Sequence, residues 1–90
     1  SFTSNQSRFV NSAQGLAEEG DFENLRIRAH ALKGSAASLG ALTLAGVAQL
    51  IEHNASDQPE VAIAALPELR FEFTRACEAL AALVAPVDSD

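Results

Sequence analysis

The sequence lacks the features of a nucleic-acid binder, a membrane protein or a disulfide-rich fold. Six Lys and Arg residues stand against twelve Asp and Glu, so the formal net charge is −6. Nucleic acids and anionic lipid surfaces require a surplus of cations, and neither is expected as a partner. One cysteine cannot form an internal disulfide. No apolar run approaches the roughly 20 residues of a membrane span, and no signal-peptide pattern opens the chain.

The chain also has no Trp, Tyr or Met, and only five Gly and three Pro. Alanine, with 18 residues, and leucine, with 11, dominate the 90 positions. No stretch alternates apolar and polar residues over the length of a strand, which predicts an all-α fold. The length predicts one domain that can fold alone. Because the chain contains no initiator methionine, we expect a domain excised from a larger protein.

Four segments show helical periodicity, at residues 4–17, 22–39, 42–54 and 59–85. Gly20 and Gly40 are expected to end helices, and Asp21 to begin one as its N-cap. Pro59 suits the first turn of the fourth helix, and Pro67 should kink or break that helix near its first two turns. Four helices with short loops predict an antiparallel up-down four-helix bundle. The domain is expected over residues 1–86, followed by a frayed acidic tail at 87–90.

Each expected helix carries one apolar stripe for the core. The stripes are Phe2, Phe9, Ala13 and Leu16 with Val10 and Ala17 beside them; Leu25, Ala29, Leu32, Ala36 and Leu39; Leu44, Val47, Ala48 and Ile51; and Ala62, Leu66, Leu69, Phe73, Ala76, Leu80 and Leu83.

A second line of residues on the second helix does not fit a plain bundle. Arg26, His30, Lys33, Gly34 and Ala37 share one face beside the apolar stripe. A glycine inside a helix costs roughly 1 kcal/mol relative to alanine, and only small residues follow Gly34 in the next turn. The turn beyond His30 is therefore stripped of bulk, and another protein can approach the imidazole closely.

This face suits phosphoryl chemistry. A neutral imidazole such as that of His30 can attack a phosphoryl group and hold it as a phosphoramidate. The transfer depends on in-line approach and on cations near the phosphoryl oxygens, and Lys33 lies one turn from His30. The chain has no GxxxxGK[ST] loop for a nucleotide. We therefore expect a phosphoryl carrier without turnover of its own rather than an enzyme.

Residues 29–41, AHALKGSAASLGA, resemble the signature of the histidine-containing phosphotransfer (Hpt) domains of bacterial phosphorelays. The pattern His-x-Leu-Lys-Gly-Ser-x-x-x-x-Gly is matched at every fixed position. The resemblance implies a four-helix bundle that takes phosphate from one receiver-domain aspartate and passes it to another. It further implies that His30 is the phosphoacceptor through Nε2, that Lys33 is the supporting cation, and that Gly34 leaves room for the receiver.

The resemblance also implies a setting for the site. Arg26, Ala37, Gln49 and Glu52 are candidates for partner binding, and Glu52 aligns with a Gln that some family members place near the imidazole. The Ala-Leu-Lys-Gly after His30 resembles the C-terminal module of hybrid sensor kinases. We expect a cytoplasmic monomer tethered to such a kinase, with receiver domains as partners. No cofactor is expected on the chain, because Mg²⁺ belongs to the receiver's aspartate pocket.

Other functions stay open at this point. One alternative is a helical adaptor, which would bind a partner without catalysing or accepting phosphoryl transfer. Another is a phosphohistidine phosphatase, which would need a second cluster of polar residues that the sequence lacks. A metal site built from His30, Glu52, His53 and Cys77 is not expected, because no spacing among them matches a ligand pair.

Overall fold

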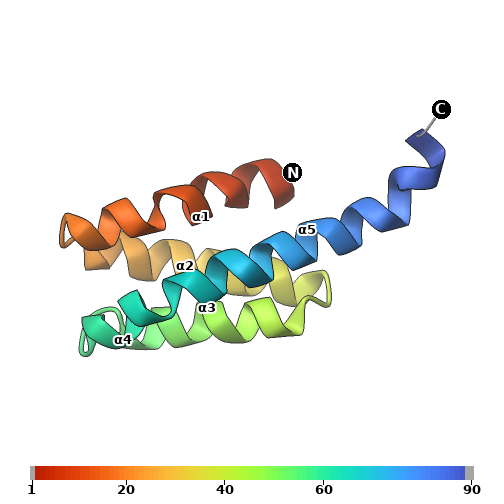
Figure 1. Cartoon of the computed structure of the whole chain (residues 1–90). Coiled ribbons are helices and arrows are strands. Elements are labelled where there is room, and N and C mark those ends of the chain that lie inside the picture. The colour runs from red at the N-terminus through yellow and green to blue at the C-terminus, as the bar shows by residue number, and fades with distance from the viewer. Residues whose placement is uncertain (1, 89–90) are drawn as a thin grey trace.

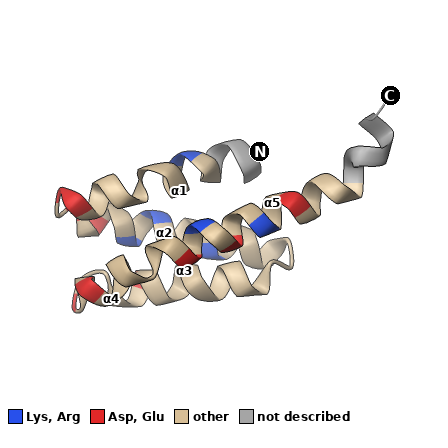
Figure 2. Cartoon of the chain, in the orientation of Figure 1, with Lys and Arg blue, Asp and Glu red and all other residues tan. Residues whose placement is uncertain are grey.

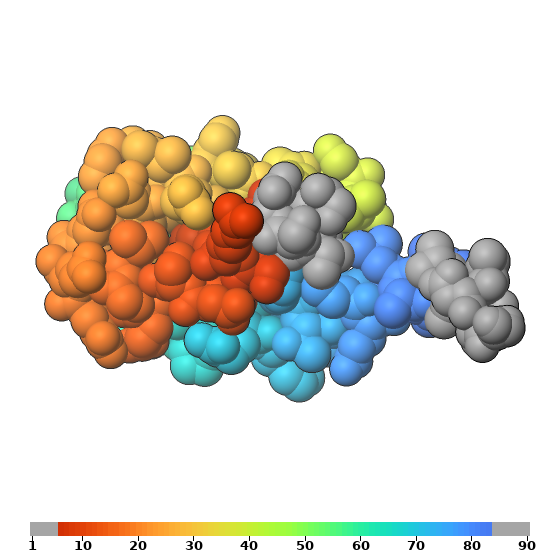
Figure 3. Space-filling view, turned by 90° about the horizontal axis from the view of Figure 1, so that it is seen from above, coloured from red at the N-terminus to blue at the C-terminus, as the bar shows by residue number. Residues whose placement is uncertain are grey.

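The computed structural model describes the backbone of residues 2–88 and the side chains of residues 6–83. Every regular element in this part of the chain is a helix, which confirms the predicted all-α class (Figure 1). The elements are α1 (Phe2–Glu18), α2 (Phe22–Ser38), α3 (Leu42–Asn54), α4 (Pro59–Ala64) and α5 (Leu66–Asp88). Helix α1 packs against both α2 and α5, and Figure 3 shows it flanked by these two helices.

The chain reverses direction at two glycines, as predicted. Gly20 has φ of +76° and Gly40 has φ of +80°, the left-handed region that favours glycine at a helix end. Helix α2 then begins with Asp21, whose carboxylate accepts from the Asn24 backbone N–H at 3.3 Å and from Asn24 Nδ2 at 2.8 Å. At the other end of α2, the Ala41 N–H donates to Ala36 O at 2.9 Å. The turn at Gly20 places α2 beside α1, and the turn at Gly40 places α3 beside α2.

The single fourth helix expected at residues 59–85 is divided into two. Helix α4 ends at Ala64 and α5 starts at Leu66, with Pro67 as the second residue of α5. Proline has no N–H to donate to the preceding turn of a helix. The division between α4 and α5 confirms the predicted break near Pro67. Helix α5 is described as far as Asp88, while Ser89 and Asp90 lie outside the described residues. The tail predicted for residues 87–90 therefore stays a prediction.

The core lies between the helices and follows the predicted stripes closely. Leu25, Ala29, Leu32 and Ala36 of α2 are fully buried, and the four residues predicted for α3 are buried as well. The predicted side chain of Phe2 lies outside the described side chains, and Leu16 is only partly buried.

Two core predictions are wrong, at the same end of the molecule. Leu39 is 48% exposed and Leu83 is 78% exposed. Helix α5 continues past the turn between α2 and α3 (Figure 1), so its apolar stripe runs beyond the helices that would cover it. Leu39 and Leu83 line an open groove of about 310 Å³ together with Leu42 and Leu80.

Charged side chains are spread over the surface of the described residues (Figure 2). Acidic residues gather at the turn between α1 and α2, and basic residues follow α2. None of the helices within residues 2–88 is long and apolar enough to cross a membrane.

Candidate functional site

The rotation of α2 is set by its buried stripe. Leu25, Ala29 and Leu32 have no exposed surface, so the residues between them face outward. His30 follows Ala29 directly, and its side chain is 65% exposed. The core of α2 thus presents the imidazole to solvent, as the sequence predicts.

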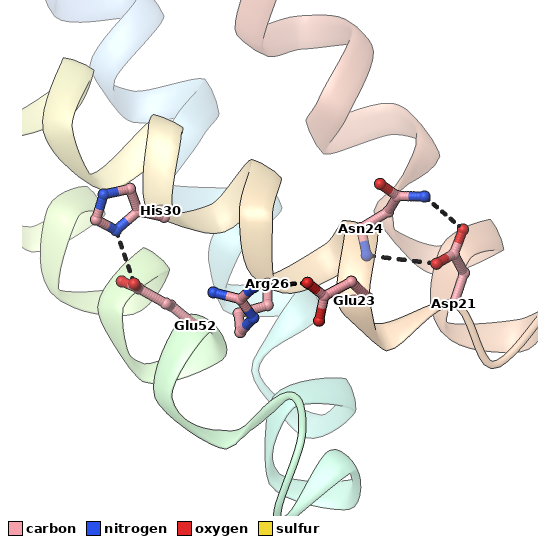
Figure 4. Close-up of polar contacts among 6 residues, drawn as sticks. All are labelled: Asp21, Glu23, Asn24, Arg26, His30 and Glu52. Carbon is pink, nitrogen blue, oxygen red and sulfur yellow. Dashed lines mark hydrogen bonds and ion pairs between the residues drawn. The ribbon is translucent and has the colours of Figure 1, made fainter.

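One contact across the two helices fixes the imidazole. His30 Nδ1 lies 2.7 Å from Oε2 of Glu52 on α3 (Figure 4). Ile51 and Ala48 are fully buried and hold α3 so that Glu52 reaches toward α2. An ionised carboxylate only accepts hydrogen bonds, so Nδ1 carries the proton. In the neutral ring, Nε2 then keeps its lone pair.

The other oxygen of Glu52 faces Lys33. The Lys33 ammonium lies 3.0 Å from Glu52 Oε1, an oxygen with no appreciable exposed surface. Burial raises the pKa of the Glu52 carboxyl, but Lys33 and His30 outweigh burial and hold the pKa below its ordinary value of 4.5. The group is therefore a carboxylate at neutral pH, as the proton on Nδ1 requires.

The exposed side chains that follow the imidazole on α2 are small. Gly34 and Ala37 are both exposed on α2. A Cβ built on Gly34 would meet nothing within 4 Å outside its own helix backbone, so packing of a neighbouring helix does not explain this glycine.

Two further candidates lie at the edge of the site. Arg26 Nη2 lies 2.7 Å from Glu23 Oε2 (Figure 4), and this hydrogen bond lowers the pKa of the Glu23 carboxyl. Arg26 also interacts electrostatically with Glu52. Gln49 is exposed on α3, one turn before Glu52. Glu52, not Gln49, is the residue of α3 that contacts the imidazole.

Sequence reasoning missed two relationships in the site. Glu23 was not among the candidates, although its i, i+3 spacing from Arg26 on a helix is the usual signal of an ion pair. Glu52 was expected to bind a partner, and the resemblance aligned it with a Gln near the imidazole, but its bridge to both His30 and Lys33 within the chain was not predicted. That bridge depends on the register between α2 and α3, which no local pattern reveals.

The His and Cys residues outside the site do not join it. His53 is exposed near the end of α3, and Cys77 is partly buried on α5. Among the described residues, no group of three or more His, Cys, Asp or Glu side chains could hold a metal ion.

Comparison with known proteins identifies a family model that covers most of the chain. The family model of the Hpt domain matches residues 2–84. None of the curated proteins and none of the solved structures matches the chain significantly. The matched range contains α1 to α4, most of α5 and every residue of the site described above.

Proposed function

Because the chain belongs to the family of Hpt domains, we propose that it is a phosphoryl carrier in which His30 accepts phosphate from a receiver-domain aspartate and passes it to another. Histidine phosphotransfer within phosphorelays is the function of this family. One observation carries the assignment to His30. Glu52 Oε2 lies 2.7 Å from Nδ1, which leaves the lone pair on Nε2 of a largely exposed ring.

The proposed step uses these atoms directly. The Nε2 lone pair of His30 attacks the phosphorus of the aspartyl phosphate, and the N–P bond forms as the P–O bond to the aspartate breaks. The electron pair of that P–O bond leaves with the aspartate as a carboxylate. The ring keeps its proton on Nδ1 and gains positive charge, which faces the Glu52 carboxylate.

The neighbouring residues support the phosphoryl group and its donor. Lys33 supplies a cation near the phosphoryl oxygens, at a side chain that is 29% exposed. Gly34 and Ala37 leave room for the receiver, and Arg26 and Gln49 contact its rim. The proposal requires no cofactor on this chain, since Mg²⁺ belongs to the aspartate pocket of the receiver.

The proposal extends to the setting of the domain. Helices α4 and α5 together take the place of the fourth helix in an antiparallel bundle. The domain acts as a monomer in the cytoplasm, within a hybrid sensor kinase whose receiver domain, or a separate response regulator, is the partner.

The test is transfer of labelled phosphate from a phosphorylated receiver in the presence of Mg²⁺. The chain is expected to gain an acid-labile, base-stable label, and His30→Gln is expected to gain none. His53→Gln is the matched control, because it changes the other, exposed histidine and should be labelled normally. A labelled His30→Gln chain would contradict the assignment. Receiver binding without any transfer to the unmodified chain would favour a helical adaptor instead.

A further inference from the structure

Glu52 holds the nitrogen of His30 that does not react. Its Oε2 atom contacts Nδ1, whereas the phosphoryl group is carried by Nε2 on the opposite side of the ring. The carboxylate side chain is only 14% exposed and is also paired with Lys33. Transfer of phosphate to Nε2 therefore leaves the contact between Glu52 and Nδ1 in place.

That contact matters when the phosphoryl group leaves. An acceptor carboxylate, or water, attacks the phosphorus, and the electron pair of the P–N bond returns to Nε2. If Nδ1 still carries its proton, the leaving group is neutral imidazole. If Nδ1 has lost its proton, the leaving group is an imidazolate anion, which is a far poorer leaving group.

We propose that Glu52 sets the lifetime of the phosphohistidine, by holding the proton on Nδ1 so that neutral imidazole departs. This inference rests on the proposed function, because it takes Nε2 of His30 as the phosphorylated atom. It also bears on whether the domain stores the phosphoryl group or passes it on. A phosphoryl group whose leaving group is kept neutral is ready for onward transfer, and the domain is suited to relaying phosphate rather than to storing it.

The other charges around the ring come from the same two helices. Lys33 of α2 shares the Glu52 carboxylate and therefore weakens its hold on the proton. Arg26 of α2 acts on Glu52 from farther away and is itself neutralised by Glu23. Helix α1 meets α2 on another face, where a side-chain hydrogen bond joins Gln6 to Ser35. Among these groups, Glu52 is the one in contact with Nδ1.

The experiment begins with chemical phosphorylation. Phosphoramidate, a small-molecule phosphoryl donor, labels an accessible imidazole without any receiver. Loss of the P–N signal is then followed by ³¹P NMR between pH 5 and pH 9 for the unmodified chain and for Glu52→Gln. The variant should lose phosphate about tenfold more slowly at pH 8, since without the opposite charge beside Nδ1 a smaller fraction of the phosphorylated rings is protonated. The two rates should converge near pH 5, where both rings are protonated.

Two more variants separate the proton effect from a structural one. In the phosphorylated chain, Lys33→Gln frees the Glu52 carboxylate from its competitor. The pH at which Nδ1 is half protonated, read from its ¹⁵N chemical shift, should therefore rise, whereas it should fall in Glu52→Gln. Glu72→Gln is the matched control. Its carboxylate side chain is 11% exposed and is paired with Arg75 on α5, and its loss should leave the midpoint unchanged.

The outcomes are distinguishable. Equal decay midpoints for the unmodified chain and a folded Glu52→Gln would overturn the inference and leave the carrier function standing. A chain that phosphoramidate labels but that no phosphorylated receiver labels would overturn the carrier function instead. A midpoint that fell in Lys33→Gln would also contradict the role given to Glu52, because removing its competitor should strengthen its hold on the proton.

Discussion

The Lys33 ammonium lies 3.0 Å from Oε1 of Glu52, the oxygen that does not contact His30. One carboxylate from α3 thus binds two side chains that are three residues apart on α2. The arrangement holds the proposed phosphoryl-supporting cation and the proposed nucleophile in a fixed relation to each other. Because the three residues come from two helices, the site depends on the packing of α2 against α3.

Replacing Lys33 by Gln should slow phosphate uptake from a phosphorylated receiver about tenfold or more. The variant loses the proposed charge-assisted contact to the phosphoryl oxygens, and such contacts contribute about 1.5 to 3 kcal/mol. The measurement is the initial rate at which labelled phosphate appears on the chain. The control is Arg28→Gln, which removes the same charge from an exposed position of the same helix. Equal slowing in both variants would assign the effect to net charge instead of to Lys33.

Replacing Gly34 by Ala should separate stability from transfer. A helical glycine costs roughly 1 kcal/mol relative to alanine, and a Cβ here meets nothing within 4 Å. The variant should therefore unfold at a higher urea concentration. Phosphate transfer from the receiver should nevertheless slow, because the added methyl group enters the surface proposed for receiver docking.

Gly15→Ala is the control for that experiment. Gly15 also lies inside a helix, α1, and its added Cβ also meets nothing within 4 Å. This variant should gain stability to a similar extent and transfer phosphate at the normal rate. If Gly34→Ala transferred phosphate as fast as Gly15→Ala, the clearance role of Gly34 would be wrong.

Gly40→Ala should have the opposite effect on stability. Its φ of +80° is a conformation that costs a residue with a Cβ about 1 kcal/mol or more, even though the surrounding space is open. The urea midpoint should fall, while the protonation of His30 and its contact with Glu52 stay as they are by NMR. An unchanged midpoint would mean that the turn between α2 and α3 relaxes to a negative φ at little cost.

Much of this fold follows from local rules. The glycines at 20 and 40 and the cap at Asp21 are read from residue type alone, since each has a backbone role that few residues fill. The break before Pro67 follows from its missing N–H. The apolar stripe of α2 likewise turns His30 outward. These features depend on neighbours within one turn, and the structure agrees with them.

The remaining features depend on where helices end relative to one another. Leu83 continues the periodic stripe of α5, yet it is 78% exposed, because α5 outruns the turn between α2 and α3. The bridge from Glu52 to His30 and Lys33 depends in the same way on the register of α3 beside α2. The periodicity of apolar residues predicts which face of its helix a residue occupies. It does not predict which residue of the neighbouring helix lies opposite.

The pH dependence of folding should report the Glu52 carboxylate directly. Burial raises its pKa, and Lys33 and His30 together lower the pKa below 4.5, so the unfolded chain binds this proton more readily. The stabilisation is present above about pH 4.5 and is lost as the pH falls through the lowered value.

The measurement compares urea unfolding of the unmodified chain and of Glu52→Gln at pH 7, 5, 4 and 3. The difference in their free energies of unfolding should shrink as the pH falls below about 4.5, where the carboxylate of the folded unmodified chain takes up its proton. Glu23, whose pKa is lowered by its hydrogen bond to Arg26, is present in both chains and cancels. A difference that stayed constant down to pH 3 would show that the bridge contributes nothing through the charge of Glu52.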